Sequence, residues 1–178
     1  MNSLLIKLAR LSAAIDSFSD WTGRAISWLT LLMVIVTFLI VVLRYVFHTG
    51  WIAMQESVLY MHGIVFLLGA AFTLRRNGHV RVDIFYREMG PKSQALVNLF
   101  GTLFFLFPTC GFMFFVSWQY VFESWIVMEA SREAGGIPAV FLLKTVILMM
   151  AALVLLQGIS EALRSVMTLV DQAPGKEG

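Results

Sequence analysis

The sequence predicts an all-α membrane protein with four transmembrane helices, and three observations support that fold class. The chain of 178 residues is 59% hydrophobic and 13% charged, with a mean hydropathy of +0.82. Uncharged runs cover residues 25–43, 57–74 and 93–122, and a fourth run, 134–160, is interrupted only by Lys144. A bilayer core of about 30 Å requires about 20 helical residues. None of the runs alternates like a barrel strand, so helices are expected, because they satisfy their own backbone groups in lipid.

Residues 1–24 are expected to form an amphipathic helix that lies in the membrane interface. Its apolar residues recur at helical spacing, and Lys7, Arg10 and Asp16 fall on other faces. The apolar set is Leu4, Leu8, Leu11, Ile15 and Phe18. The first span is then predicted at about residues 25–47. No small-residue cleavage pattern accompanies it, which favours an uncleaved span over a signal peptide.

The second span is predicted at about residues 53–75, and it carries a face of small residues. This face consists of Gly63, Gly69, Ala70, Ala71 and Thr73. Small residues allow helices in a membrane to approach closely, so this face is expected to pack either within the bundle or against another chain.

The connector between the second and third spans begins at Arg75. Its Asn77-Gly78 pair is typical of a hairpin turn, but a hairpin is rejected because the chain before Asn77 is still a membrane helix. Asp83 is expected to cap one or two helical turns that end before Pro91. The connector is therefore predicted to lie against the membrane surface on the cytoplasmic side.

The third span is predicted at about residues 93–122 and the fourth at about 137–162. An uncharged helix of 30 residues is about 45 Å long, which exceeds the bilayer core and indicates tilt or a kink at Pro108. The alternative for Pro108 and Gly111 is an unwound segment of the kind that builds binding sites in secondary transporters. Cys110 is the single cysteine, so an internal disulfide and a cluster of thiolate ligands are both excluded.

The distribution of lysine and arginine predicts that both termini are cytoplasmic. Ten of these residues fall on the side of the termini and two on the other side, and cytoplasmic loops carry the excess of basic residues. The ten are Lys7, Arg10, Arg24, Arg75, Arg76, Arg81, Arg87, Lys92, Arg164 and Lys176, and the two are Arg44 and Arg132. Because the basic residues border spans, the formal charge of +2 gives no support for nucleic-acid binding.

Two ionisable residues within the spans are functional candidates, because such residues are costly to place in lipid. His62 lies about two turns inside the outer end of the second span, and it is expected to be packed and hydrogen-bonded, with a haem ligand as the alternative. A bis-histidine haem lacks its second ligand, since His48 and His79 both fall in loops. Lys144 lies in the first turn of the fourth helix. It is expected to snorkel outward or to pair with a glutamate such as Glu133, and the alternative is an acidic group on a partner subunit.

The outer rim carries further polar candidates. Arg44 ends the first helix and Glu56 opens the second, so a local ion pair is expected between them, with Trp51 as an interfacial anchor. The loop of residues 123–138 is acidic, and it is interpreted either as a docking face for an extracytoplasmic protein or as a solvated loop. Its charged residues are Glu123, Glu129, Arg132 and Glu133.

Several classes of function find no support in the sequence. It contains no Ser-His-Asp set, no HExxH motif, no phosphate-binding loop and no pair of carboxylates within a span, so neither an enzyme nor a bound cofactor or metal is expected. It also has no internal repeat of the kind found in secondary transporters. A non-catalytic subunit with a larger partner fits best. The alternatives are a haem-binding membrane anchor of a respiratory enzyme and a self-contained channel or exporter.

Four short segments together resemble a known family. They are "VVLRYVF" at the end of the first helix, "QE" at the start of the second, "LGAAFTLRRNGHVRVD" at its cytoplasmic end, and "GGIP" before the fourth. In this order and spacing they are similar to the small membrane subunit, DctQ, of tripartite ATP-independent periplasmic (TRAP) transporters, over roughly residues 28–160.

The resemblance implies a multi-pass protein of the bacterial inner membrane whose partners are a large TRAP membrane subunit, a periplasmic substrate-binding protein and the membrane lipids. The binding protein would deliver an organic acid to the large subunit, which would move it inward with sodium ions. The small subunit would brace the large subunit and offer part of the docking surface. The matched positions are Arg44, Tyr45 and Glu56 at the outer rim and Arg75, His79 and Asp83 in the connector. The substrate and sodium sites of this family belong to the large subunit, so none is assigned to this chain.

Overall fold

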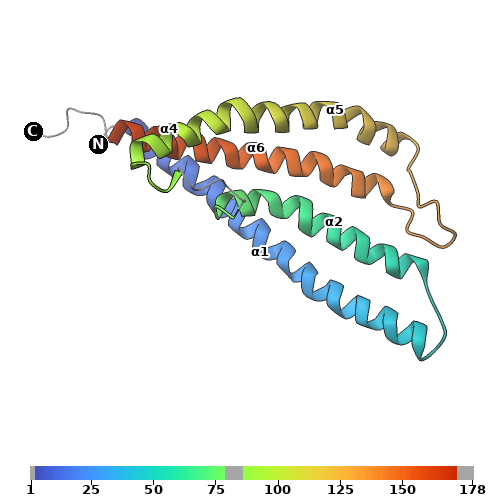
Figure 1. Ribbon diagram of the computed structural model, residues 1–178. Coiled ribbons are helices and arrows are strands. Elements are labelled where there is room, and N and C mark those ends of the chain that lie inside the picture. The colour runs from blue at the N-terminus through green and yellow to red at the C-terminus, as the bar shows by residue number, and fades with distance from the viewer. Residues whose placement is uncertain (1–2, 79–85, 172–178) are drawn as a thin grey trace, which may run out of the picture.

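All regular structure in the described part of the chain is helical. The computed structural model describes residues 3–78 and 86–171. Its elements are α1 (Ser3–Tyr45), α2 (Ile52–Arg75), α4 (Pro91–Gly101), the π-helical segment η1 (Thr102–Leu106), α5 (Phe107–Ile126) and α6 (Val140–Asp171), as Figure 1 shows. Four helices are long and apolar enough to cross a membrane, the third being α4, η1 and α5 together. The predicted fold class is therefore confirmed.

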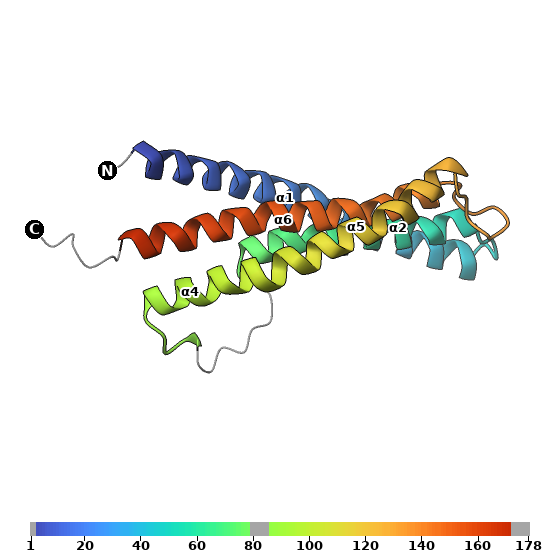
Figure 2. The ribbon, with the colours of Figure 1, turned by 90° about the horizontal axis from the view of Figure 1, so that it is seen from above.

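Helix α6 is the centre of the bundle. It contacts α1, α2, α4, η1 and α5, whereas α1 packs mainly on α2 and α6. Figure 2 shows α6 between α1 and α4. The start of α1 and the end of α6 lie at the same end of the bundle in Figure 1, which we call the terminal end. The opposite end holds residues 46–51 and 127–139 and is called the loop end.

Helix α1 differs from the sequence prediction, because the predicted interfacial helix and the first span form one continuous helix. Its 43 residues give a length of about 65 Å. The apolar residues Leu11 and Phe18 are 50% and 44% exposed, while the side chains of Ser12, Asp16 and Ser19 are buried. The side chain of Leu4 lies outside the described part. In a membrane, small and polar residues pack between helices and apolar ones face lipid, which explains why the small and polar face of α1 points inward.

The Asn77-Gly78 pair ends α2 and makes no hairpin. Asn77 takes a left-handed conformation with φ of 52°. The N–H of Gly78 donates to the carbonyl of Thr73 at 2.9 Å, and the N–H of Asn77 donates to that of Leu74 at 3.1 Å. This is the Schellman arrangement, in which the last free carbonyls of a helix find donors. Residues 79–85 lie outside the described part of the chain, and so do the predictions for His79 and Asp83.

The third apolar run stays helical past its proline. Proline lacks an N–H and its ring collides with the carbonyl four residues earlier, which for Pro108 is that of Phe104. The segment Thr102–Leu106 is π-helical, and the wider turn absorbs this conflict. Pro91–Ile126 is therefore helical throughout, without an unwound segment. The prediction was tilt or a kink at Pro108, and the structure has a π-helical segment just before this residue.

The small residues predicted on α2 contribute to packing inside the bundle. Ala71 is almost fully buried in a core cluster with Leu74, Cys110 and Val154, and Ala70 packs against that cluster. On α1, Gly23 faces the ring of Phe72 so closely that a Cβ at this position would lie 2.3 Å from the ring. The crossing of α1 and α2 therefore depends on a missing side chain.

We expect Gly23→Ala to destabilise the fold, because the added methyl overlaps Phe72 and overpacking costs about 1–3 kcal/mol. The matched control is Gly111→Ala in α5, since a Cβ at Gly111 meets no atom within 4 Å. A helix interior gains about 1 kcal/mol when glycine becomes alanine, so this control should unfold at the same temperature as the parent or higher. Thermal unfolding in detergent measures both. Equal midpoints for the two variants would contradict the assigned contact.

Candidate functional site

A buried polar cluster joins three helices near the terminal end. It is formed by one face of α1, the C-terminal end of α2 with Arg76 after it, and residues 157–164 of α6. We call it the terminal cluster, and its members are Ser12, Asp16, Ser19, Asp20, Arg75, Arg76, Gln157, Ser160, Glu161 and Arg164. Most of these side chains are buried or half-buried, although the segments around them are apolar.

Asp16 is the centre of the terminal cluster. Its Oδ1 accepts hydrogen bonds from Gln157 Nε2 at 2.9 Å and from Ser160 Oγ at 2.7 Å. Its Oδ2 accepts one from Arg164 Nη1 at 2.8 Å and lies 3.2 Å from Arg75 Nε. The Arg75 contact is an ion pair without a hydrogen bond, since Arg75 Nε has no hydrogen-bond partner in the described part of the chain. One carboxylate of α1 is therefore held by residues of both α2 and α6.

Neutral side chains extend the terminal cluster along the α1–α6 contact. Ser19 donates to Gln157 Oε1 at 2.6 Å, so both ends of the buried Gln157 amide are paired. The hydroxyls of Ser12 and Ser160 lie 2.8 Å apart. Because Ser160 gives its one proton to Asp16, Ser12 is the donor of this pair. Buried polar groups of this kind are stable only when each of them finds a partner.

The charges of the terminal cluster balance. Asp20 pairs with Arg76 at 3.2 Å and lies 3.7 Å from Arg75, and Arg164 also donates to Glu161. The set therefore has three carboxylates and three guanidinium groups. A balanced, hydrogen-bonded set avoids most of the cost of taking charges out of water. Its physical effect is to fix the positions of three helices relative to one another.

The sequence contained a signal for this cluster that the analysis of apolar periodicity missed. Ser12, Asp16, Ser19 and Gly23 follow one another at intervals of four, three and four residues, which places them on one face of a helix. Asp16, predicted on a face away from the apolar residues of an interfacial helix, is instead buried between α1, α2 and α6. Arg75, predicted for the connector, is the last residue of α2 and faces α1.

A second polar cluster fixes the loop end. Glu56, in the first turns of α2, accepts a hydrogen bond from Ser131 Oγ and another from the N–H of Ile137 at 2.6 Å. Gly136 allows this approach, because a Cβ there would lie 2.4 Å from Ser131 Oγ and 2.8 Å from Glu56 Oε1. Gly135 has a φ of 81°, which favours glycine. The "QE" and "GGIP" segments, 80 residues apart, are therefore parts of one contact.

Lys144 pairs within the chain, with a different partner from the predicted one. Its Nζ lies 2.5 Å from Glu129 Oε2 and 3.9 Å from the centre of the Tyr120 ring. The expected partner Glu133 is exposed, so the prediction named the right loop and the wrong glutamate. Glu129 also accepts from Ser124 Oγ at 2.7 Å. The hydrogen bonds from Lys144 and Ser124 hold the pKa of the Glu129 carboxyl below its ordinary value of 4.5.

The other rim residues remain at the surface. Arg44 is exposed, and Tyr45 and Trp51 are 74% and 64% exposed. The predicted Arg44–Glu56 ion pair is wrong, because both oxygens of Glu56 are used by the loop of residues 127–139. Amphipathic aromatic side chains in this position suit the membrane–water interface.

His62 is exposed on the outer face of α2. Its ring stacks on that of Phe66, with ring centroids 6.2 Å apart. The expected hydrogen bond is not formed with any residue in the described part of the chain. Within residues 3–78 and 86–171, no three histidine, cysteine, aspartate or glutamate side chains are grouped so that they could hold a metal ion.

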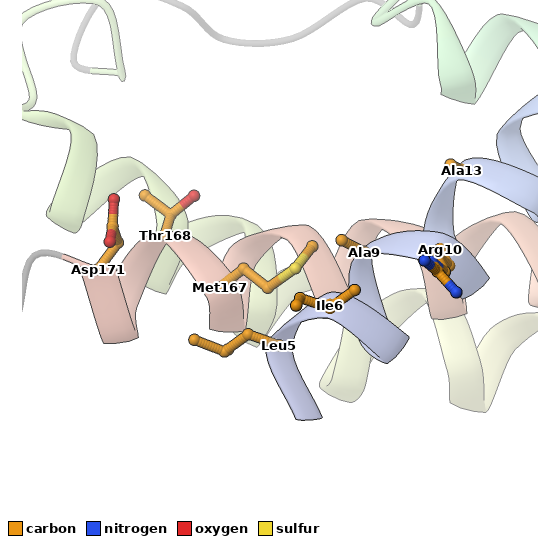
Figure 3. Close-up of a pocket in the computed structure, with 8 residues that line it drawn as sticks. All are labelled: Leu5, Ile6, Ala9, Arg10, Ala13, Met167, Thr168 and Asp171. Carbon is orange, nitrogen blue, oxygen red and sulfur yellow. The ribbon is translucent and has the colours of Figure 1, made fainter. Parts of the chain in front are cut away.

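A groove lies beyond the terminal cluster, where the start of α1 and the end of α6 run side by side. Figure 3 shows Leu5, Ile6, Ala9 and Met167 as its apolar lining, with Arg10, Thr168 and Asp171 among the polar residues. Its volume is about 590 Å³. The groove places apolar surface and a basic residue together at the terminal end.

Comparison with known proteins points to one family. The model of the DctQ component of tripartite ATP-independent periplasmic transporters matches residues 33–168. No curated protein and no solved structure matches the chain. The matched range contains the whole loop-end contact and the α2 and α6 residues of the terminal cluster, but it begins after Asp16.

We expect Asp16→Asn to destabilise the bundle by about 1–3 kcal/mol, because two guanidinium groups lose their shared carboxylate and keep only Asp20 and Glu161 as acidic partners. The matched control is Asp20→Asn, one helical turn further along α1, whose ion pairs lie at a more exposed rim and should cost less than about 1 kcal/mol. Thermal unfolding midpoints in detergent measure the difference. A larger loss of stability for Asp20→Asn than for Asp16→Asn would show that Asp16 is not the centre of the terminal cluster.

The pairing of Glu129 predicts that the loop of residues 127–139 loosens in acid. A carboxyl whose pKa is lowered on folding contributes stability above its unfolded pKa, and that contribution is lost as the pH falls through the folded pKa. Hydrogen exchange of this loop should therefore be slow at about pH 7 and accelerate relative to intrinsic rates below about pH 4. Glu129→Gln should exchange fast at both values. A parent loop that stays equally protected in acid would contradict the proposed role of Glu129.

Proposed function

The chain belongs to the DctQ family of tripartite ATP-independent periplasmic transporters, and from this membership we propose that it is a non-catalytic brace for the large membrane subunit. It is the small membrane subunit of such a transporter and a multi-pass protein of the inner membrane. In the proposed role it holds the large subunit in the bilayer while that subunit takes up an organic acid with sodium ions. The chain itself binds neither the acid nor sodium.

The observation that carries this proposal is the internal pairing of charges near both ends of the bundle. The terminal cluster joins α1, α2 and α6, and the loop-end contacts join α2, α5 and α6. Moving any of these helices would break several hydrogen bonds at once, each costing about 1–3 kcal/mol if a charged group is left unpaired. Such a bundle suits a fixed support better than a carrier, which must exchange polar contacts during its cycle.

A transport site within this chain has little support. Transporters bind their solutes near the middle of the bilayer, with polar groups that line a cavity between helices. In the described residues, the ion pairs lie toward the helix ends and the buried core cluster is apolar apart from Cys110. His62 is nearer the middle of its helix, but it faces outward.

The orientation and surroundings of the bundle follow from charge and shape. We propose that the terminal end is cytoplasmic, because ten of the twelve basic residues counted outside the spans belong to that side. The first turns of α1 and the groove beside them combine apolar residues with Arg10, which fits contact with membrane lipids at the cytoplasmic interface. The loop end would then face the periplasm.

We also propose that the loop end offers part of the docking surface for the periplasmic binding protein. Glu56 and Glu129 hold the loop of residues 127–139 against α2 and α6, while Arg132 and Glu133 remain exposed. A fixed loop with free charges can steer and orient a protein partner at little entropic cost.

The brace role is tested by reconstitution into liposomes under a sodium gradient. The chain is inserted alone, the large subunit is inserted alone, and both are inserted together, each with the binding protein and its organic acid outside. We expect uptake only with both membrane subunits, and less uptake with Asp16→Asn than with the parent, because this variant loosens the contact of α1 with α2 and α6. Uptake by this chain alone would reject the proposal.

The docking role is tested in the same assay by reversing one charge. Glu133→Lys should raise the binding-protein concentration that gives half-maximal uptake by a few fold, because one rim charge mainly alters association. Glu88→Lys, at an exposed position outside the loop end, is the matched control. If both variants behave like the parent, the loop is not part of the docking surface.

A further inference from the structure

A groove of about 610 Å³ opens between α1 and α2 in the half of the bundle nearer the loop end. Residues of both helices line it, among them Met33, Thr37, Gln55, Leu59 and His62. It lies on the outside of the bundle, since Thr37, Gln55, Leu59 and His62 are exposed. Val34 and Val58 complete the lining, so three of its seven side chains are polar.

His62 is deep in the membrane at this groove. It comes ten residues after Ile52, the first residue of α2, which corresponds to about 15 Å along the helix axis. The hydrocarbon core is about 30 Å thick, so the imidazole lies near its middle. Its ring stacks on that of Phe66, and its side chain makes no hydrogen bond to any residue that the structure describes.

The polar side chains of the groove have unused hydrogen-bonding groups. The imidazole of His62 carries a donor and an acceptor, and the Gln55 amide and Thr37 hydroxyl carry more. All three residues are exposed, and their side chains have no hydrogen bond to any residue that the structure describes. Lipid tails offer no partner, and an unpaired polar group in hydrocarbon costs several kcal/mol. Gln55 lies within one turn of Ile52, close to the interface, whereas Thr37 and His62 lie deeper. These two deep polar groups therefore indicate a protein neighbour.

The outer face of α5 provides the contrast. Phe112 and Phe115 on this helix are 69% and 81% exposed. Phe115 lies eleven residues before the last residue of α5, which places it about as deep in the membrane as His62. Large aromatic hydrocarbons without hydrogen-bonding groups are stable against lipid tails. The two outer faces thus differ in the neighbour that they can accept.

We propose that the groove between α1 and α2 receives a transmembrane helix of the large membrane subunit, and that this helix presents a hydrogen-bonding side chain to His62. The inference rests on the proposed function, which supplies a membrane-embedded partner. The polar groups of the groove determine the kind of occupant, because a phospholipid headgroup stays at the interface and its tails cannot pair with an imidazole. The face with Phe112 and Phe115 is assigned to lipid.

Photo-crosslinking in the assembled complex tests the placement. A photoreactive residue is introduced at Thr37 or Leu59 in the groove, and at Phe112 or Phe115 as controls at comparable exposure. We expect adducts with the large subunit from the two groove positions and lipid adducts alone from the two α5 positions. Adducts with the large subunit from α5, with lipid alone in the groove, would overturn the assignment.

The role of His62 is tested by substitutions that differ in hydrogen-bonding capacity. His62→Leu should lower the amount of large subunit that copurifies with the chain by about threefold to tenfold, the range expected for one interhelical hydrogen bond in a membrane. His62→Gln keeps a donor and an acceptor and should retain most of it, and Phe115→Leu should have no effect. Equal recovery for His62→Leu and His62→Gln would overturn the proposed hydrogen bond. A haem spectrum in the parent protein that is lost in His62→Leu and in His62→Gln would also overturn the proposed hydrogen bond.

Failure of the inference can be distinguished from failure of the proposed function. If the parent chain copurifies no large subunit, and uptake by the large subunit does not require the parent chain, the proposed function and the groove assignment are both rejected. If the complex forms and transports but the crosslinks map to α5, the brace role stands and the groove assignment alone is rejected.

Discussion

The structure depends on one constraint, which is that polar side chains buried between the helices must find their partners inside the protein. Asp16 illustrates it most clearly, because this carboxylate on a largely apolar helix is surrounded by Gln157, Ser160, Arg164 and Arg75. In water, an amphipathic helix would turn such a residue outward. Here the apolar residues Leu11 and Phe18 face out, and the small and polar face of α1 packs inward.

The same constraint explains why the two polar clusters have different forms. Near the terminal end, three long helices cross, so charged and neutral side chains from helix interiors meet directly. At the loop end, the partners come from the loop of residues 127–139, whose backbone and hydroxyl groups donate to Glu56 while Glu129 binds Lys144. The loop needs glycines at 135 and 136 to reach Glu56, and the helices need Gly23 to approach Phe72. Tight backbone geometry and polar pairing therefore support each other.

Local patterns predicted the fold well and the polar contacts poorly, for a physical reason. Hydropathy is a property of a single segment, so the four apolar helices and the irregularity before Pro108 were predictable from the sequence. Pairing is a relation between segments, and nothing in the sequence around Asp16 names Gln157 or Arg164 as its partners. The choice of Glu129 over Glu133 depends on the conformation of a loop that includes Met128 at positive φ. Residues with the spacing of Ser12, Asp16 and Ser19 have the same periodicity whether they face water or another helix.

The distribution of paired and unpaired groups argues for a support that is complete except along one face. Near its ends the bundle matches carboxylates with guanidinium, ammonium, hydroxyl and amide groups, so these regions require no other subunit to be stable. A carrier needs the opposite, because its polar groups must change partners as it moves a solute. The groove between α1 and α2 differs from these regions, because His62 and Thr37 face outward there without a hydrogen bond to any residue that the structure describes. A rigid bundle with unpaired polar groups in this groove suits a fixed neighbour of a moving subunit. A rigid partner loses little conformational entropy on binding, and the unpaired polar groups determine where the contact forms.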